Sequence, residues 1–265
     1  MRVAFFGIAG PVTKAASGNV AFVVQARCDE RLVSVLVDCS GTPAADLDAV
    51  EVDIRELDAV ILTHTHTDHL YALPSLVHNA LMQQRSRPLC IAGNSATIAR
   101  AVELLGVFNL LDRRGMFAIE WRQIDAAGLR LPDGEAGLAI TGVPVQHSVP
   151  TIGLRFEHPG GCLFYSCDTR PFAELSTYAQ GASMLIHEAS GLLADEARLN
   201  DAGHASARQA GTLAQTVGAG QLFLVHLPPG AVEGKHGELL REAAAIFCGG
   251  LQVPELRRWY HVREV

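Results

Sequence analysis

An apolar run that stops abruptly at a cluster of metal-binding residue types is the feature that most constrains this chain. Residues Ala59–Leu62 are fully apolar, and the next seven residues, 63–69, read THTHTDH. From Leu70 to Gln84 the apolar residues recur at the three- to four-residue spacing of an amphipathic helix. A short, fully apolar run is typical of a buried strand. The cluster is therefore expected between a buried strand and a helix.

The cluster itself has the composition of a transition-metal site. It places His64, His66, Asp68 and His69 within six residues. Neutral imidazole nitrogen suits zinc and its neighbours, and a carboxylate adds charge and can orient a bound water. Calcium and magnesium prefer shells made of oxygen alone. We therefore expect a divalent transition metal here.

The rest of the chain alternates between groups of strands and groups of helices. This order predicts a layered α/β fold in a single domain over residues 1–265. Residues 107–135 give no clear pattern. Strands are expected at Val3–Ala9, Val20–Arg27, Leu32–Asp38, Leu89–Ala92, Leu138–Gln146, Ile152–Glu157, Cys162–Ser166, Met184–Ile186 and Leu222–Val225, and helical segments at Asp53–Leu57, Ser95–Leu105, Ser206–Val217 and Glu238–Phe247.

Composition excludes several classes of protein. Hydrophobic residues make up 49% of the chain, which fits a globular core rather than a disordered tail. The formal net charge of −7 provides no general basic surface for nucleic acid. No segment is apolar enough to suggest a membrane span. The six cysteines lie mostly in apolar runs without paired metal spacing, so we expect reduced thiols and a cytoplasmic protein.

The pattern His64-x-His66-x-Asp68-His69 resembles the motif of the metallo-β-lactamase superfamily. Three further residues stand where that superfamily has its remaining ligands: His147, Asp168 and His226. The resemblance implies a four-layer αββα sandwich, in which two mixed β-sheets are flanked by helices.

The resemblance also implies a pair of metal ions. One would be held by His64, His66 and His147, and the second by Asp68, His69 and His226, with Asp168 bridging both. The di-iron oxidoreductase branch of the superfamily has a carboxylate where this chain has His66, so two Zn²⁺ ions are favoured, with manganese or iron as alternatives. Asp38 is expected to orient one of the ligand imidazoles.

Within the superfamily, the chain is most similar to tRNase Z and its relatives. Residues 186–190, IHEAS, resemble one late motif of that family, and residues 203–207, GHASA, resemble another. The likeness implies that Glu188 orients His204, which acts as a general acid, while Asp68 orients the attacking hydroxide. Glu188 and His204 could instead have structural roles. His187 is expected to point away from the metals and to brace Asp68 or a neighbouring loop.

The expected function is that of a dinuclear-metal hydrolase, acting as a phosphodiesterase on a nucleotide-like or other small molecule. A metal-bridging hydroxide would be the nucleophile. Extended tRNA binding is not expected, because only a short link joins Phe156 to Leu163 where tRNase Z carries its long arm. A homodimer is possible. The alternatives are a lactone, thioester, sulfate-ester or β-lactam hydrolase on the same site, or a metal-binding accessory protein without turnover.

Overall fold

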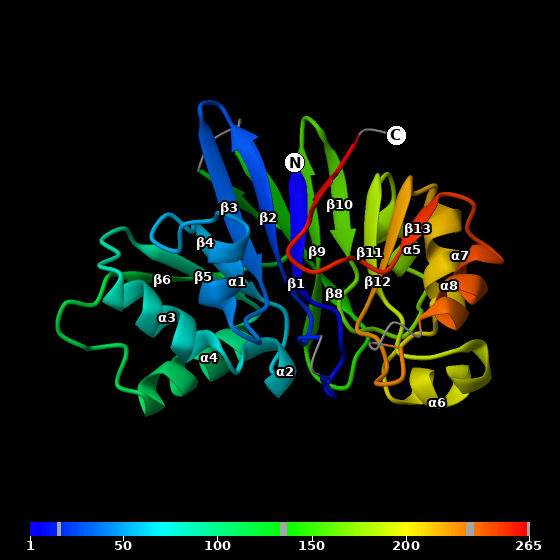
Figure 1. Cartoon of the computed structure of the whole chain (residues 1–265), viewed down its shortest axis with the longest axis horizontal. Coiled ribbons are helices and arrows are strands. Elements are labelled where there is room, and N and C mark those ends of the chain that lie inside the picture. The colour runs from blue at the N-terminus through cyan, green and yellow to red at the C-terminus, as the bar shows by residue number, and fades with distance from the viewer. Residues whose placement is uncertain (15–16, 133–136, 232–235, 264–265) are drawn as a thin grey trace.

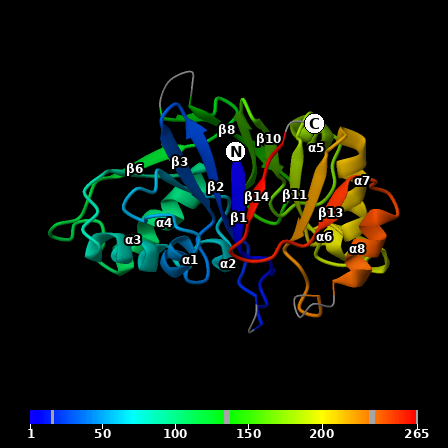
Figure 2. The ribbon, with the colours of Figure 1, turned by 45° about the horizontal axis from the view of Figure 1, so that its top comes forward.

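Two β-sheets pack face to face between two layers of helices. The computed structural model describes residues 1–14, 17–132, 137–231 and 236–263. Helices α1, α3 and α4 cover the outer face of one sheet, and α5, α7 and α8 cover the outer face of the other (Figure 1). The view in Figure 2 shows the same four layers. This confirms the predicted four-layer α/β sandwich.

Each sheet combines antiparallel and parallel pairing. The first sheet has the order β14-β1-β2-β3-β4-β5-β6, and the second has the order β13-β12-β11-β10-β9-β8-β7. The strands of the first sheet are β1 (Arg2–Gly7), β2 (Ala21–Cys28), β3 (Arg31–Val37), β4 (Ala59–Leu62), β5 (Leu89–Gly93), β6 (Ile119–Gln123) and β14 (Trp259–His261). The strands of the second are β7 (Leu129–Leu131), β8 (Leu138–Val145), β9 (Thr151–His158), β10 (Gly161–Tyr165), β11 (Met184–Glu188), β12 (Gln221–Val225) and β13 (Gly250–Gln252).

The helices are short. The first four are α1 (Pro43–Ala49), α2 (Thr67–Leu70), α3 (Leu73–Met82) and α4 (Ser95–Val107). The others are α5 (Leu175–Ala179), α6 (Glu196–Asp201), α7 (Ala207–Val217) and α8 (Gly237–Ala244). No helix among the described residues is both long enough and apolar enough to cross a bilayer.

The sheets are apolar on both faces, as a layered sandwich requires. In β1, Val3 and Phe5 face the core between the sheets, while Ala4 and Phe6 face the core under the helices. Side chains alternate between the two faces of a strand, so each face buries its own set. This double burial explains why the sequence shows apolar runs rather than alternation.

Two features of the fold differ from the sequence-based expectations. The amphipathic helix begins at Leu73, after the separate turn of α2, because Pro74 fits only in the first turn of a helix. The segment Asp53–Leu57 forms a single turn, as expected, in which the backbone N–H of Glu56 donates to the carbonyl oxygen of Asp53. Helices α1, α5 and α6 were not anticipated.

The strand topology brings the chemical residues to one edge of the sandwich. Strands β3 and β4 are parallel, as are β10, β11 and β12. The carboxyl ends of parallel strands meet at the same edge. Residues that follow these strands, and the loop after β8, can therefore meet near α2 and α6 (Figure 1).

Candidate metal centre

The structure brings together all seven residues predicted as ligands. Potential ligand atoms converge in overlapping groups, and within each group the atoms lie within 4.8 Å of one another. One group is His64, His66, His147 and Asp168; another is Asp68, His69 and His226; a third is Asp168, His204 and His226. The first two groups correspond to the two sets of ligands expected from the sequence, although their roles as ligands stay a prediction.

Three imidazole nitrogens of the first group point at one another. The Nδ1 atom of His66 lies 3.1 Å from Nε2 of His64 and 3.1 Å from Nε2 of His147. Burial lowers the pKa of all three imidazoles, most strongly that of His64. Neutral rings can present lone pairs to a common point, which is the arrangement a metal ion requires.

Asp168 lies between the two groups. Its Oδ2 atom is 3.1 Å from His226 Nε2, 3.5 Å from His69 Nε2 and 3.8 Å from His64 Nε2. Asp68 reaches the second group from α2, with Oδ2 3.7 Å from His69 Nε2 and 3.8 Å from His226 Nε2. One carboxylate is thus placed to serve both groups, and the other serves the second alone.

The buried polar atoms of this cluster fit a bound cation. The Nε2 atom of His69 and the Oδ1 atom of Asp168 are both buried without a hydrogen-bond partner. Buried polar atoms are nearly always paired, and an unpaired one costs free energy unless an ion or water satisfies it. The donor set of imidazole nitrogens and carboxylate oxygens matches a transition metal such as zinc.

Hydrogen bonds behind the cluster set which nitrogen of each ring faces it. The Nδ1 atom of His69 lies 2.7 Å from Asp38 Oδ2, and Nδ1 of His147 lies 2.8 Å from the carbonyl oxygen of Gly203. A ring that donates through Nδ1 presents its Nε2 lone pair to the metal side. Asp38 is thus hydrogen-bonded to the ring of His69, and its role in orienting a metal ligand stays a prediction.

Asp38 is itself firmly held. It directly follows β3, has a positive φ of 56°, and is fully buried. Its Oδ1 atom accepts hydrogen bonds from the backbone N–H and the hydroxyl of Thr63, each at 2.9 Å. Backbone conformations of this kind are retained where the surrounding structure fixes them, often beside functional groups.

Glu188 and His204 form a pair next to the cluster. His204 Nδ1 lies 3.0 Å from Glu188 Oε2, and the His204 ring centre is 4.8 Å from that of His147 and 5.1 Å from that of His226. Glu188 is fully buried, whereas the His204 side chain is 22% exposed. Burial lowers the pKa of His204, but the Glu188 carboxylate outweighs this and raises it.

His187 and Cys167 lie near the cluster but are not among its predicted ligands. His187 points away from the metal cluster, as expected, but its Nδ1 donates to the carbonyl oxygen of Glu188 rather than bracing Asp68. Cys167 has a positive φ of 55°. Its sulfur lies 3.7 Å from His64 Nδ1, and burial raises the pKa of its thiol well above the ordinary value.

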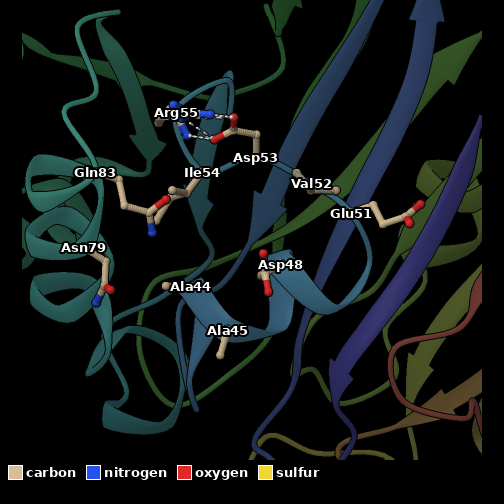
Figure 3. Close-up of a pocket in the computed structure, with 10 residues that line it drawn as sticks. All are labelled: Ala44, Ala45, Asp48, Glu51, Val52, Asp53, Ile54, Arg55, Asn79 and Gln83. Atoms are coloured by element: carbon tan, nitrogen blue, oxygen red, sulfur yellow. Dashed lines mark hydrogen bonds and ion pairs between the residues drawn. The ribbon is translucent and has the colours of Figure 1, made fainter.

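A hollow elsewhere on the surface is lined by none of the residues of the metal cluster. It has a volume of about 610 Å³ and lies between α1, α3 and the segment 51–55 (Figure 3). Asp48, Glu51 and Asp53 make its wall acidic, and Arg55 pairs with Asp53 at 2.6 Å. Size alone does not make it the reactive site.

Comparison with known proteins decides the family. Residues 34–227 match the profile of the beta-lactamase superfamily domain. The chain belongs to the metallo-β-lactamase superfamily. This membership makes it part of a family of metal-dependent hydrolases that typically use zinc, and the His/Asp cluster is its candidate metal site.

Individual relatives of this superfamily member agree with the assignment. A ribonuclease Z from Salinibacter ruber is 28% identical over an alignment that covers 85% of this chain and 84% of that protein. The metallo-β-lactamase fold protein YhfI from Bacillus subtilis superposes with a TM-score of 0.80 at 25% identity, covering 98% of both chains. The short form of human tRNase Z shares the fold, with a TM-score of 0.77 at 19% identity and 99% coverage of both.

Several contributors to the site of this metallo-β-lactamase superfamily member have no clear signal in the sequence. The hydroxyl of Ser190 contacts both Glu188 and His226. Gly10 leaves room for the His226 ring, because a Cβ atom there would lie 2.9 Å from Cε1 of that ring. The glycines in segment 7–10 indicate that the backbone there approaches another group closely. The sequence does not show that this group is His226, which lies 216 residues away.

Proposed function

We propose that this chain is a two-zinc phosphodiesterase that hydrolyses a small or nucleotide-like phosphodiester. In this proposal, His64, His66 and His147 hold one ion and Asp68, His69 and His226 hold the other, with Asp168 shared. Manganese or iron could replace zinc in the same donor set. The Zn²⁺ ions would supply an ionised water as nucleophile and positive charge for the phosphoryl oxygens.

The observation that carries the proposal is the placement of the Glu188–His204 pair beside the candidate metal cluster. Glu188 holds His204 through Nδ1, so Nε2 is the atom available to give a proton to a departing alkoxide. The pKa of His204 is raised by the Glu188 carboxylate, which extends the pH range over which the ring carries a proton to donate. An alkoxide is a poor leaving group without a proton, so such an acid suits the cleavage of a phosphodiester.

Glu188 is suited to orient His204 rather than to take part directly in the hydrolysis. Its Oε1 accepts a hydrogen bond from the backbone N–H of Thr169 at 2.5 Å, and its Oε2 accepts one from the Ser190 hydroxyl at 2.6 Å. A fully buried carboxylate with these contacts stays in one position. The loop that carries His204 is fixed in turn by Ser206, which begins α7 with a capping box that includes Gln209.

Two observations favour a small substrate. The β9–β10 hairpin closes between paired residues His158 and Gly161 with only two residues in its loop, so no arm extends from it. The net charge of −7 is unfavourable for gripping an extended polyanion. The Salinibacter ruber relative is named as a ribonuclease, and a ribonuclease cleaves phosphodiester bonds. We propose the same type of bond for this chain, but not the same substrate.

The test is a substrate panel with the zinc-loaded enzyme. It contains bis(4-nitrophenyl) phosphate, a lactone, a thioester, an aryl sulfate and a cephalosporin. We expect the phosphodiester to have the highest kcat/KM, and His204→Ala to lower kcat for it by about 10²–10⁴-fold. His78→Ala, which alters a histidine outside the metal-binding groups, is the matched control.

Three results would contradict the proposal or part of it. Preferred turnover of a lactone, thioester, sulfate ester or cephalosporin would assign another electrophile to the same site. Full metal loading without hydrolysis of any of these compounds would favour a metal-binding protein without turnover. Unchanged phosphodiester turnover by His204→Ala would remove that residue from the reaction.

A further inference from the structure

A separate hollow of about 390 Å³ opens beside the candidate metal centre. It is bounded by the loop after β8, by Arg170, and by the end of α6. His147, a candidate ligand, and Gly203, which directly precedes His204, lie side by side in its lining. A molecule cleaved next to His204 would therefore have one of its two arms in this hollow.

Arg170 is held by hydrogen bonds from its backbone N–H and its Nε, whereas its two terminal guanidinium nitrogens are free to bind a ligand. Its backbone N–H donates to the carbonyl oxygen of Gln146 at 2.9 Å, and its Nε donates to Gln146 Oε1 at 3.0 Å. Within the described part of the chain, no carboxylate pairs with its guanidinium group. The two terminal nitrogens are thus available to an anion, and the fork of a guanidinium matches the geometry of a phosphate.

The part of the lining formed by the end of α6 also has unused polar groups. The side-chain Oδ1 of Asn200 is buried without a hydrogen-bond partner. Asp201 lies in the same part of the lining, and its carboxylate forms no ion pair with Arg170 in the described residues. A hollow that offers both a free cation and free acceptors suits a ligand that has both an anion and hydroxyl groups.

We propose that this hollow is a subsite for a second, terminal phosphate on the leaving arm of the substrate. The inference rests on the proposed phosphodiesterase function. Arg170 binds the terminal phosphate through its terminal nitrogens, and the Asp201 side accepts hydrogen bonds from sugar hydroxyls. The substrate class narrows to a phosphodiester with a phosphorylated sugar or nucleoside arm. Arg170 is then the residue that determines this specificity.

The experiment compares three dinucleotides that differ only in a terminal phosphate: ApA, pApA and ApAp. We expect the wild-type enzyme to prefer either pApA or ApAp over ApA by about 10–100-fold in kcat/KM, which is the range of one bidentate, charge-assisted contact. In Arg170→Gln this preference should disappear, mainly through KM, because the contact is made equally in the ground and transition states. Arg170→Lys should retain part of it.

Two further variants serve as matched comparisons. Asp201→Asn removes a negative charge from the hollow, so it should keep or increase the preference for the phosphorylated dinucleotide. Arg241→Gln removes an exposed arginine from α8, and it should leave the preference unchanged. A thermal melt of each variant shows whether the fold is retained.

A binding measurement separates this inference from the proposed function. We expect adenosine 3′,5′-bisphosphate to inhibit or bind about 10–100-fold more tightly than adenosine 5′-monophosphate, and Arg170→Gln to remove the difference. Hydrolysis of ApA without any preference for pApA or ApAp would overturn the subsite alone. A preference that Arg170→Gln leaves intact would do the same. Failure to hydrolyse any diester would overturn the proposed function, whereas the inhibitor pair would still test the subsite.

Discussion

The hydroxyl of Ser190 lies 2.9 Å from Nδ1 of His226. The same hydroxyl donates a hydrogen bond to Glu188 Oε2 at 2.6 Å. Since its one proton goes to the carboxylate, its lone pair accepts the Nδ1–H of His226, and the Nε2 atom of that ring faces Asp168. One serine thus connects a candidate metal ligand with the residue that holds the candidate general acid.

Ser190→Ala tests this connection. Loss of the hydroxyl frees the His226 ring to change tautomer, so we expect the affinity for the second zinc ion to fall by about 10–100-fold. The measurement is competition with a chromophoric chelator. Ser190→Thr keeps a hydroxyl and should retain most of the affinity. Unchanged zinc affinity in Ser190→Ala would contradict the role given to this contact.

The pH dependence of turnover should follow His204. Its pKa is raised by Glu188, so the protonated acid is present below that raised value and is lost as the pH rises through it. We expect kcat of the wild-type enzyme to decline on the alkaline side. Glu188→Gln removes the charge that raises the pKa, so the decline should begin at a lower pH. If both enzymes had superimposable pH–kcat profiles, His204 would not be the acid.

Gly10→Ala should affect the metal centre without a large change in the fold. The added Cβ would lie 2.9 Å from Cε1 of His226, closer than real Cβ contacts allow, so the ring must move. We expect weaker binding at the group formed by Asp68, His69 and His226, measured as metal content after dialysis. Gly106→Ala in α4 is the control, because nothing lies within 4 Å of its added Cβ. Equal metal content in the two variants would contradict this prediction.

Removal of metal should lower thermal stability as well as activity. Ligands that bind only the folded state stabilise it, by about 2.7 kcal/mol at a concentration 100 times Kd. We expect chelation to lower Tm and abolish hydrolysis, and two equivalents of zinc per chain to restore both. Calorimetry and elemental analysis measure these effects. An identical Tm with and without zinc would argue against a bound ion at the cluster.

Arg85 should contribute strongly to stability, although it lies outside the metal-binding groups. It is only 3% exposed, and its guanidinium donates five hydrogen bonds to the backbone carbonyls of residues 54, 55, 57, 87 and 88. Arg85→Met leaves these acceptors without a donor, so we expect the free energy of unfolding to fall by about 2–5 kcal/mol in chemical denaturation. Arg241→Met on the surface of α8 should change it by less than about 0.5 kcal/mol. A similar small loss for Arg85→Met would show that water replaces the donor.

The edge strands β6 and β7 and the short helices could not be predicted from the sequence, because they lack the apolar patterns that identify buried strands and long helices. Strand β6 has the sequence IEWRQ and lies at the edge of the first sheet, where polar residues face solvent and no apolar run develops. Strand β7 is only three residues long at the other sheet's edge. Short helices such as α5 and α6 lack the repeated apolar spacing that identifies α7.

The sequence by itself determined the layered α/β class, the junction of strand and helix at residues 63–69, and the types of residue available for binding metal. These properties depend on local order: apolar periodicity and closely spaced ligands are visible in consecutive residues. Tertiary structure alone decided which nitrogen of each imidazole faces the cluster. The bonds from Asp38 to His69, from Gly203 to His147 and from Ser190 to His226 span 31, 56 and 36 residues. Such sequence separations are closed only when the strands that carry these residues have taken their places in the fold.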